Sequence, residues 1–177
     1  DALPISLEKL GFDAASLQAL SPGLVDVSLN AWGWQGPWRN RRGFDSLVQM
    51  SCGIAEQGMR WKQHDAPVPL PVQALDHATG YLMAAAVLAG LRQRLQHGCG
   101  NQTRLSLART AWLLEQHRYG LNEQQTGITP RLCDNQPCIE LTPWGIGVRL
   151  RSAAWLPGTT LQCATPGNPP GTHPAHW

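Results

Sequence analysis

The sequence predicts an α/β protein that is rich in helices, has short strands and ends in an extended tail. Two short segments alternate apolar and polar residues with the period of a strand, and several others have helical apolar spacing. Apolar residues make up 42% of the 177 residues, enough for a packed core. The order of elements lacks the regular alternation that builds a doubly wound sheet. We therefore expect part of a larger α/β structure.

The first quarter of the chain predicts helix, strand and loop in that order. Residues 1–23 contain apolar spacing for one or two short helices, the second with Asp13 as its N-cap. Residues 24–32 alternate as a strand. Residues 33–43 combine a Gly-Pro pair with tryptophans and arginines, which indicates a loop.

The next segments predict two helices joined by a polar connector. Residues 44–57 are expected to form a single helix capped near Asp45, and residues 58–71 the connector. A long helix is expected from His77 to His97, with Asp76 as its N-cap and a glycine directly after it as its stop.

Two glycines inside this long helix, Gly80 and Gly90, lower its intrinsic stability by about 1 kcal/mol each relative to alanine. We interpret both as places where another backbone approaches closely.

The second half predicts one more strand–helix pair, then a hairpin. Residues 103–108 indicate a short strand and residues 108–120 a helix. Residues 138–150 resemble a hairpin, and residues 156–177 an irregular tail rich in proline and glycine. The predicted division is 1–120 and 121–177, with the second part packing on the first or on a partner subunit.

Composition excludes several classes of function. The net charge of +2 is too small to indicate nucleic acid as the main partner. The five cysteines include Cys133 and Cys138, but no second pair follows at zinc-ligand spacing, so we predict no metal site and reduced thiols in a cytoplasmic protein. The longest apolar run, from Tyr81 to Leu91, is shorter than the roughly 20 residues of a membrane span. Residues 1–30 lack the pattern of a signal peptide.

Asp76 is the first candidate for chemistry. A carboxylate at a helix N-terminus is expected to have a lowered pKa and to stay ionised, because backbone N–H groups and the helix dipole favour the anion. An ionised carboxylate is what a nucleophile requires, but it is equally what a purely structural cap requires. The neighbouring His77 invites an acid–base role, although adjacent helical residues point about 100° apart. Local pattern alone favours a cap.

The loop at residues 33–43 is the second candidate. It contains basic and aromatic side chains that are suited to an anionic ligand with a ring: Trp34, Trp38, Arg39, Arg41 and Arg42. The alternative is a solvated loop without a ligand.

Three segments of the chain, residues 24–54, 74–111 and 168–177, together resemble the class III CoA-transferase family, which includes formyl-CoA transferase, L-carnitine dehydratase-like proteins and α-methylacyl-CoA racemase. "LVDVSLNAWGWQGPWRNRRGFDSLVQMSCGI" resembles the family's strand, Gly-x-x-Gly-Pro loop, acidic residue and "xxxQxxxG" helix. "ALDHATGYLMAAAVLAGLRQRLQHGCGNQTRLSLARTA" resembles the block with the catalytic aspartate, and "NPPGTHPAHW" resembles the closing segment.

The resemblance implies an activity and a set of site residues. Asp76 falls on the aspartate that attacks an acyl-CoA to give a mixed anhydride and then an aspartyl-CoA thioester, from which a free carboxylic acid takes the CoA. Arg42, Phe44, Asp45 and Leu107 fall on positions near substrate or CoA, with Leu107 expected on the strand after the helix. Coenzyme A thioester is then a substrate, and no permanently bound cofactor is implied.

The departures from the family pattern leave alternatives open. The racemase branch has a histidine where this chain has Phe44, so racemisation is disfavoured. Family members are much longer and form interlocked dimers, and the arginine expected near Leu3 is absent. The chain is thus expected to work as part of an interlocked homodimer or with a partner chain that supplies an N-terminal half. The alternative is a non-catalytic CoA-binding or assembly subunit, or a fragment.

Overall fold

The computed structural model describes residues 10–117 and 129–174, and it divides into two compact units, Asp1–Gly120 and Leu121–Trp177. Each unit is described by itself. The short helix expected around residues 6–10 lies almost entirely outside the described residues.

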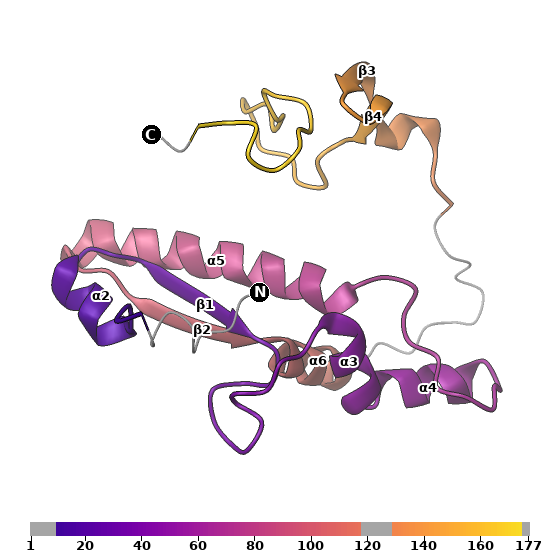
Figure 1. Cartoon of the computed structure of the whole chain (residues 1–177), viewed down its shortest axis with the longest axis horizontal. Coiled ribbons are helices and arrows are strands. Elements are labelled where there is room, and N and C mark those ends of the chain that lie inside the picture. The colour runs from indigo at the N-terminus through magenta and orange to yellow at the C-terminus, as the bar shows by residue number, and fades with distance from the viewer. Residues whose placement is uncertain (1–9, 118–128, 175–177) are drawn as a thin grey trace. The chain divides into compact units, whose positions relative to one another are not determined.

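The first unit contains two strands and five helices in its described part (Figure 1). They are α2 (Ala14–Leu20), β1 (Asp26–Asn30), α3 (Asp45–Ser51), α4 (Ile54–Trp61), α5 (Ala74–His97), β2 (Gln102–Ser106) and α6 (Leu107–Gln116). The Asp13 carboxylate accepts the Ser16 N–H at 3.0 Å, which confirms Asp13 as the N-cap of α2.

The two predicted strands pair with each other. β1 and β2 are parallel and in register from Asp26↔Gln102 to Asn30↔Ser106. Parallel strands need a long crossover, and here α3, α4 and α5 lie between them in sequence. In Figure 1, α5 runs along the strand pair while α3, α4 and α6 gather at one end. The mixed helix and short-strand architecture confirms the predicted fold class.

The prediction of one helix over residues 44–57 is wrong, because the segment forms two helices. α3 ends at Ser51, and Gly53 adopts φ 87°, a left-handed conformation that glycine reaches without a steric penalty. α4 then continues to Trp61, into the segment expected to be connector. The break lets the two helices point in different directions from the same core.

The hydrophobic core of the first unit is small. Its buried apolar side chains come from the end of β1 and from four helices: Ala31, Val48, Ile54, Leu75, Leu107 and Ala111. Many large apolar side chains elsewhere stay exposed, among them Leu88 and Leu95 on α5. The core therefore sits at the end of the unit where α3, α5 and α6 meet.

The two glycines of α5 have different surroundings. A side chain added at Gly90 would clash with Asn101 Oδ1 and Val25 Cγ1, so this glycine does mark a close approach, made by side chains rather than by backbone. Nothing lies within 4 Å of a Cβ at Gly80 in the described structure, so the expectation of a close approach there is wrong.

One helix among the described residues, α5, is long and apolar enough to cross a membrane by length and composition. The core helix of a soluble protein passes the same test, and one face of α5 packs on β1, β2, α3 and α6.

The second unit is built on the predicted hairpin. A 3-10 turn, η1 (Leu132–Asp134), leads into β3 (Asn135–Thr142), which pairs antiparallel with β4 (Gly145–Leu150). Glu140 and Arg149 form an ion pair of 2.8 Å between the strands. From Arg151 to Pro174 the described tail has only an isolated bridge, Leu156↔Thr159, as predicted for an irregular segment.

Candidate active site

Asp76 is the third residue of α5, so the prediction that it caps the helix is wrong. The helix begins at Ala74 and its N-cap residue is Gln73, whose side chain makes no capping hydrogen bond. The structure adds two helical residues before Asp76 that local pattern does not reveal. Asp76 is exposed, and no hydrogen bond to its carboxylate is found in the described structure.

The electrostatics of Asp76 also differ from expectation. Partial burial of the carboxyl raises the pKa of Asp76 above its ordinary value, the nearby charge of Asp45 raises it further, and His77 lowers it. The prediction of a lowered pKa is wrong, because it relied on the helix dipole and on capping bonds from backbone N–H groups, and Asp76 is not the N-cap residue.

Asp45 holds the amino end of α5 from outside the helix. It is 2% exposed, and its Oδ2 accepts the backbone N–H of Asp76 at 2.9 Å. Its Oδ1 accepts from the side chain of Gln49, which is also 2% exposed. Asp45 thus provides the cap that Asp76 was expected to provide. Gln49 was not among the predicted site residues, although its place in the "xxxQxxxG" motif could have indicated it.

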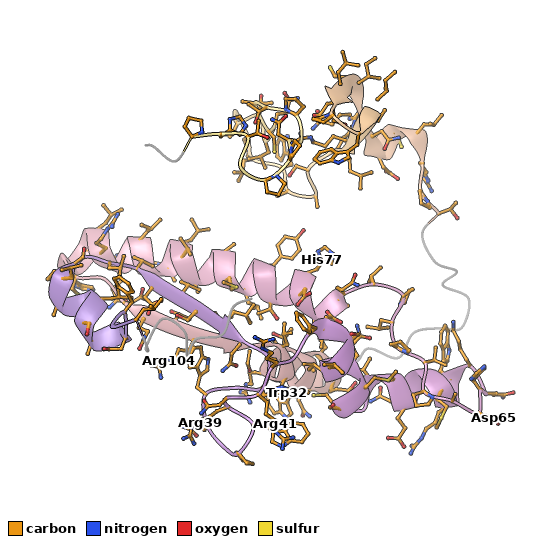
Figure 2. All side chains as sticks on the ribbon, in the orientation of Figure 1. Trp32, Arg39, Arg41, Asp65, His77 and Arg104 are labelled. Carbon is orange, nitrogen blue, oxygen red and sulfur yellow. The ribbon has the colours of Figure 1, made fainter. Side chains whose placement is uncertain are left out.

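The other predicted site residues differ from one another in burial and in the element that carries them. Phe44 is exposed and precedes α3 as its N-cap residue. Leu107 is 4% exposed, belongs to the core and begins α6, so its expected place on a strand is wrong. His77 is exposed beside Asp76 on α5 (Figure 2).

The loop at residues 33–43 is held by its tryptophans. Trp32 Nε1 donates to Arg42 O at 3.1 Å, and Trp32 meets Trp38 edge to face with ring centroids 4.8 Å apart. The guanidinium of Arg41 stacks over Trp38 at 4.9 Å.

A second stacked pair lies beside this loop: Arg104 of β2 covers Trp34 at 4.8 Å, and Trp34 Nε1 donates to Leu105 O. Figure 2 shows Trp32, Arg39, Arg41 and Arg104 around the loop. The loop thus carries exposed arginines, and contacts with tryptophan rings stabilise its conformation.

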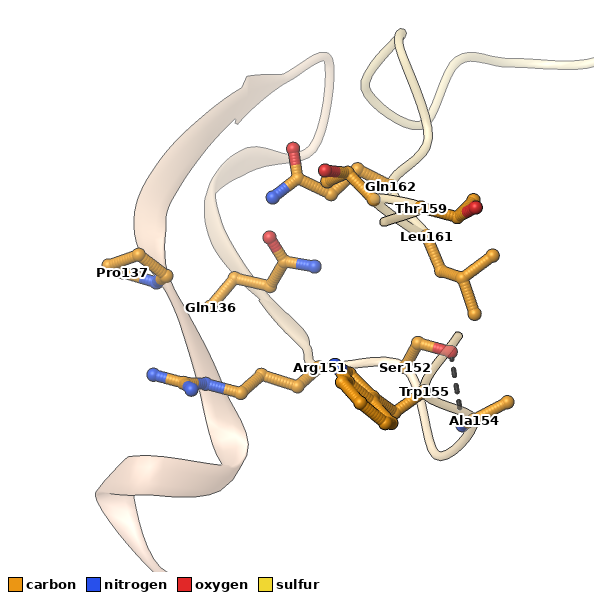
Figure 3. Close-up of a pocket in the computed structure, with 10 residues that line it drawn as sticks. Gln136, Pro137, Arg151, Ser152, Ala154, Trp155, Thr159, Leu161 and Gln162 are labelled. Carbon is orange, nitrogen blue, oxygen red and sulfur yellow. Dashed lines mark hydrogen bonds between the residues drawn. The ribbon is translucent and has the colours of Figure 1, made fainter. Parts of the chain in front are cut away.

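The second unit contains a separate cavity of about 400 Å³ (Figure 3). It lies between β3 and the tail, and its lining mixes amide and hydroxyl side chains with apolar ones, together with Arg151 and Trp155. None of its lining residues is among the predicted site residues. Within residues 10–117 and 129–174, no group of three or more His, Cys, Asp or Glu side chains could hold a metal ion, and all five cysteines are free.

Comparison with known proteins gives consistent similarities. The model of CoA-transferase family III matches residues 2–139. The "Probable fatty acyl-CoA transferase Rv3272" of Mycobacterium tuberculosis is 33% identical over 104 residues, which is 59% of this chain. The formyl-CoA:oxalate CoA-transferase of a Bradyrhizobium species is 28% identical over 93% of this chain. A crystal structure of Rv3272 superposes with a TM-score of 0.57 and 32% identity, covering 63% of this chain and 31% of that one.

These relatives are much longer than this chain, which spans 26% of the first protein and 36% of the second. The match of the family model nevertheless covers well over half of the 177 residues and includes Asp45, Asp76 and Leu107. The chain belongs to CoA-transferase family III.

Proposed function

We propose that this chain carries the nucleophile of a CoA-transferase, and that the nucleophile is the Asp76 carboxylate. One Asp76 oxygen attacks the thioester carbonyl of an acyl-CoA, the C–S bond breaks, and a mixed anhydride and CoA thiolate result. The thiolate then attacks the Asp76 carbonyl, which forms aspartyl-CoA and releases the donor acid. A second carboxylic acid repeats the two steps in reverse and leaves with the CoA.

The observation that carries this proposal is the setting of Asp76 within the region that matches the family. Its side chain is exposed at the amino end of a helix, while its backbone N–H is bonded to a buried carboxylate. A nucleophile must be accessible and yet held in a fixed geometry, and this arrangement meets both requirements. A raised pKa also makes the ionised carboxylate more basic, which favours attack on a carbonyl.

The predicted binding residues take different parts in this proposal. Arg42 lies on the exposed loop with Arg39 and Arg41, and such guanidinium groups suit the phosphates of CoA. Phe44 is exposed and offers an apolar surface close to Asp45 in sequence. Leu107 supports the core under the site. Asp45 is buried, so in our proposal it holds Asp76 rather than binding CoA.

The remainder of the substrate pocket comes, in this proposal, from further chain or from a partner subunit. This chain spans only 26% of Rv3272, and exposed apolar side chains on α5 and on the hairpin offer surfaces for such a contact. An interlocked dimer in the cytoplasm, without membrane or nucleic acid, remains our proposal for the assembly.

The test is chemical trapping of the intermediate in the intact protein, with any further chain or partner subunit present. The protein is mixed with a panel of acyl-CoA thioesters and hydroxylamine, and the peptide that contains Asp76 is examined by mass spectrometry. We expect a hydroxamate at Asp76 in the wild type and in Asp65→Asn, an exposed aspartate control, and none in Asp76→Asn. An unmodified Asp76 peptide despite measurable CoA transfer would overturn the proposal.

A non-catalytic CoA-binding or assembly subunit is the second candidate, favoured by the short span of the chain relative to its relatives. It predicts CoA binding with an unmodified Asp76 and unchanged transfer in Asp76→Asn when the partner is present. Racemisation is the least favoured reading, because Phe44 cannot exchange protons; isotope exchange at the α-carbon of an acyl-CoA would reveal it.

A further inference from the structure

We propose that Asp45 and Gln49 act together as positioning residues, fixing the amino end of α5 so that the Asp76 carboxyl keeps one place beside one fixed negative charge. We call this pair the Asp45–Gln49 clamp. The inference rests on the proposed function of Asp76 for its catalytic consequence, although its structural part can be tested without any reaction.

The hydrogen bonds of Gln49 join two segments, α3 and the connector that precedes α5. Its Nε2 donates to Asp45 Oδ1 within α3 and to Val72 O at 3.1 Å, and its Oε1 accepts the Leu70 N–H at 2.8 Å. The connector that leads into α5 is therefore tied to α3 through one buried side chain. Because Asp45 Oδ2 accepts the Asp76 N–H, the same pair also holds the first turn of α5.

Burial makes this arrangement costly to disturb. Asp45 and Gln49 are each 2% exposed, so any bond that they lose cannot be replaced readily by water. Asp45 is also the first residue of α3 and lies against the beginning of α5, so the positive ends of two helices face one carboxylate. Two helix N-termini explain how a carboxylate is accommodated at a buried position.

The clamp also sets the charge around Asp76. The charged groups that shift the pKa of Asp76 are Asp45 of α3, which raises it, and His77 of α5, which lowers it, in addition to burial. A change in the charge at position 45 should therefore move the titration of Asp76, while a purely structural residue would change only stability.

The hydrogen bond between positions 45 and 49 can be tested by exchanging its acceptor and donor side chains. A carboxylate at position 45 accepts two N–H groups, and an amide can accept only one of them. In Asp45→Asn, either the Asp76 N–H or Gln49 Nε2 thus loses its acceptor. In the double variant Asp45→Asn/Gln49→Glu, the introduced amide can donate to the introduced carboxylate and still accept the Asp76 N–H. That carboxylate also accepts the Leu70 N–H, but the bond to Val72 O is replaced by a repulsive contact between two oxygen atoms, so the exchange restores the clamp only in part.

The experiment compares the wild type, Asp45→Asn and the double variant in the intact protein. The matched control is Asp26→Asn, since Asp26 accepts hydrogen bonds from Ser28 and Gln102 at the far end of β1. Two quantities are measured against pH: the rate of acyl-enzyme formation at low acyl-CoA concentration, and the ¹³C NMR shift of the Asp76 carboxyl, assigned with Asp76→Asn. Circular dichroism reports folding.

We expect Asp45→Asn to move the Asp76 titration to lower pH and to slow acyl-enzyme formation by about 10- to 100-fold, because misplacement of a nucleophile is costly. The double variant should recover part of that rate, with a titration between those of the wild type and Asp45→Asn. Asp26→Asn should change neither quantity. If Asp45→Asn fails to fold, the double variant tests the clamp. If both variants fail to fold, the clamp is tested on the wild type, by the titration of Asp76 and by the protection of its backbone amide from hydrogen exchange.

The outcomes separate this inference from the proposed function. An acyl-enzyme at Asp76 whose rate and titration are unchanged in Asp45→Asn would overturn the clamp and leave the nucleophile in place. A wild-type Asp76 that titrates at or below the ordinary value, or whose amide exchanges freely, would also overturn it. Absence of any acyl-enzyme would overturn the proposed function, while the NMR titration would still decide whether the clamp exists.

Discussion

The two ends of α5 lie in different surroundings. At the amino end, Leu75 is fully buried, Thr79 shares a buried hydrogen bond of 2.7 Å with Thr110, and the backbone of Asp76 is held by Asp45. Towards the carboxyl end, apart from the buried Gly90, large apolar side chains such as Leu95 remain exposed. Among the described residues of the first unit, the amino end of α5 is thus packed and hydrogen-bonded, whereas its carboxyl half presents exposed apolar side chains.

This contrast separates two tasks of a CoA-transferase site. Fixing a nucleophile requires short-range hydrogen bonds and packing, which α3, α5 and α6 supply within one unit. Enclosing a substrate as large as acyl-CoA requires more surface, and a chain that spans 26% of a relative has little of it. The exposed apolar side chains of α5, such as Leu88 and Leu95, are where our proposal places a contact with further chain or a partner subunit.

The strongest test of the contrast replaces one leucine at each end of α5. Leu75→Ala should lower the free energy of unfolding by about 2–5 kcal/mol, because it leaves a cavity in the core. Leu95→Ala, at 87% exposure, should change it by less than about 0.5 kcal/mol and should instead weaken association with any covering subunit. Urea denaturation and sedimentation velocity measure the two effects. Equal stability losses at both positions would contradict the contrast.

The two glycines of α5 give a second comparison, for which we expect a moderate effect on stability. Gly90→Ala should destabilise the protein by about 1–3 kcal/mol, because the added methyl group overlaps Asn101 and Val25. Gly80→Ala meets open space and should stabilise the helix by up to about 1 kcal/mol. Thermal unfolding of both variants provides the measurement. A stabilising Gly90→Ala would show that Val25 and Asn101 do not pack against the helix as described.

The smallest expected effect concerns Asp76 itself. Its pKa is raised in the folded state, so its contribution to stability is fully present below the ordinary pKa of an aspartate and is lost as the pH rises through the raised value. Asp76→Asn removes the ionisable group and thus this pH-dependent loss of stability. Because Asp76 is not the N-cap residue, no capping bond is lost, and the free energy of unfolding at neutral pH should stay the same or rise by less than about 0.5 kcal/mol. Urea titrations between pH 3 and 7 would test this, in steps of about 1 pH unit. A clear loss of stability would indicate that Asp76 serves as a cap.

Sequence patterns predicted the elements of this fold better than the junctions between them. Alternating residues identified both strands and the hairpin, because half-buried strands impose period two. The break at Gly53 was missed since apolar spacing continues across it, and only the left-handed φ of that glycine separates α3 from α4.

At the candidate site, the structure corrects the expected local geometry, while the functional roles of the residues stay predictions. Resemblance to the family singled out Asp76 and Asp45, yet local pattern assigned the cap to the wrong one. The cap comes from a residue 31 positions earlier in the chain, and a contact of that separation leaves no periodic signal. The contacts of Gln49 with Leu70 and Val72 likewise leave no periodic signal, although its place in the family motif marks the residue itself.

The most direct measurement of the central claim follows the oxygen atoms of Asp76. The intact protein is incubated with an acyl-CoA and an acceptor acid labelled with ¹⁸O in its carboxyl group. The mass of the peptide that contains Asp76 is then measured by mass spectrometry. If Asp76 passes through anhydride and aspartyl-CoA intermediates, one acceptor oxygen stays on the aspartate at each transfer, so its carboxyl must gain ¹⁸O. Turnover that leaves Asp76 without ¹⁸O would contradict the account.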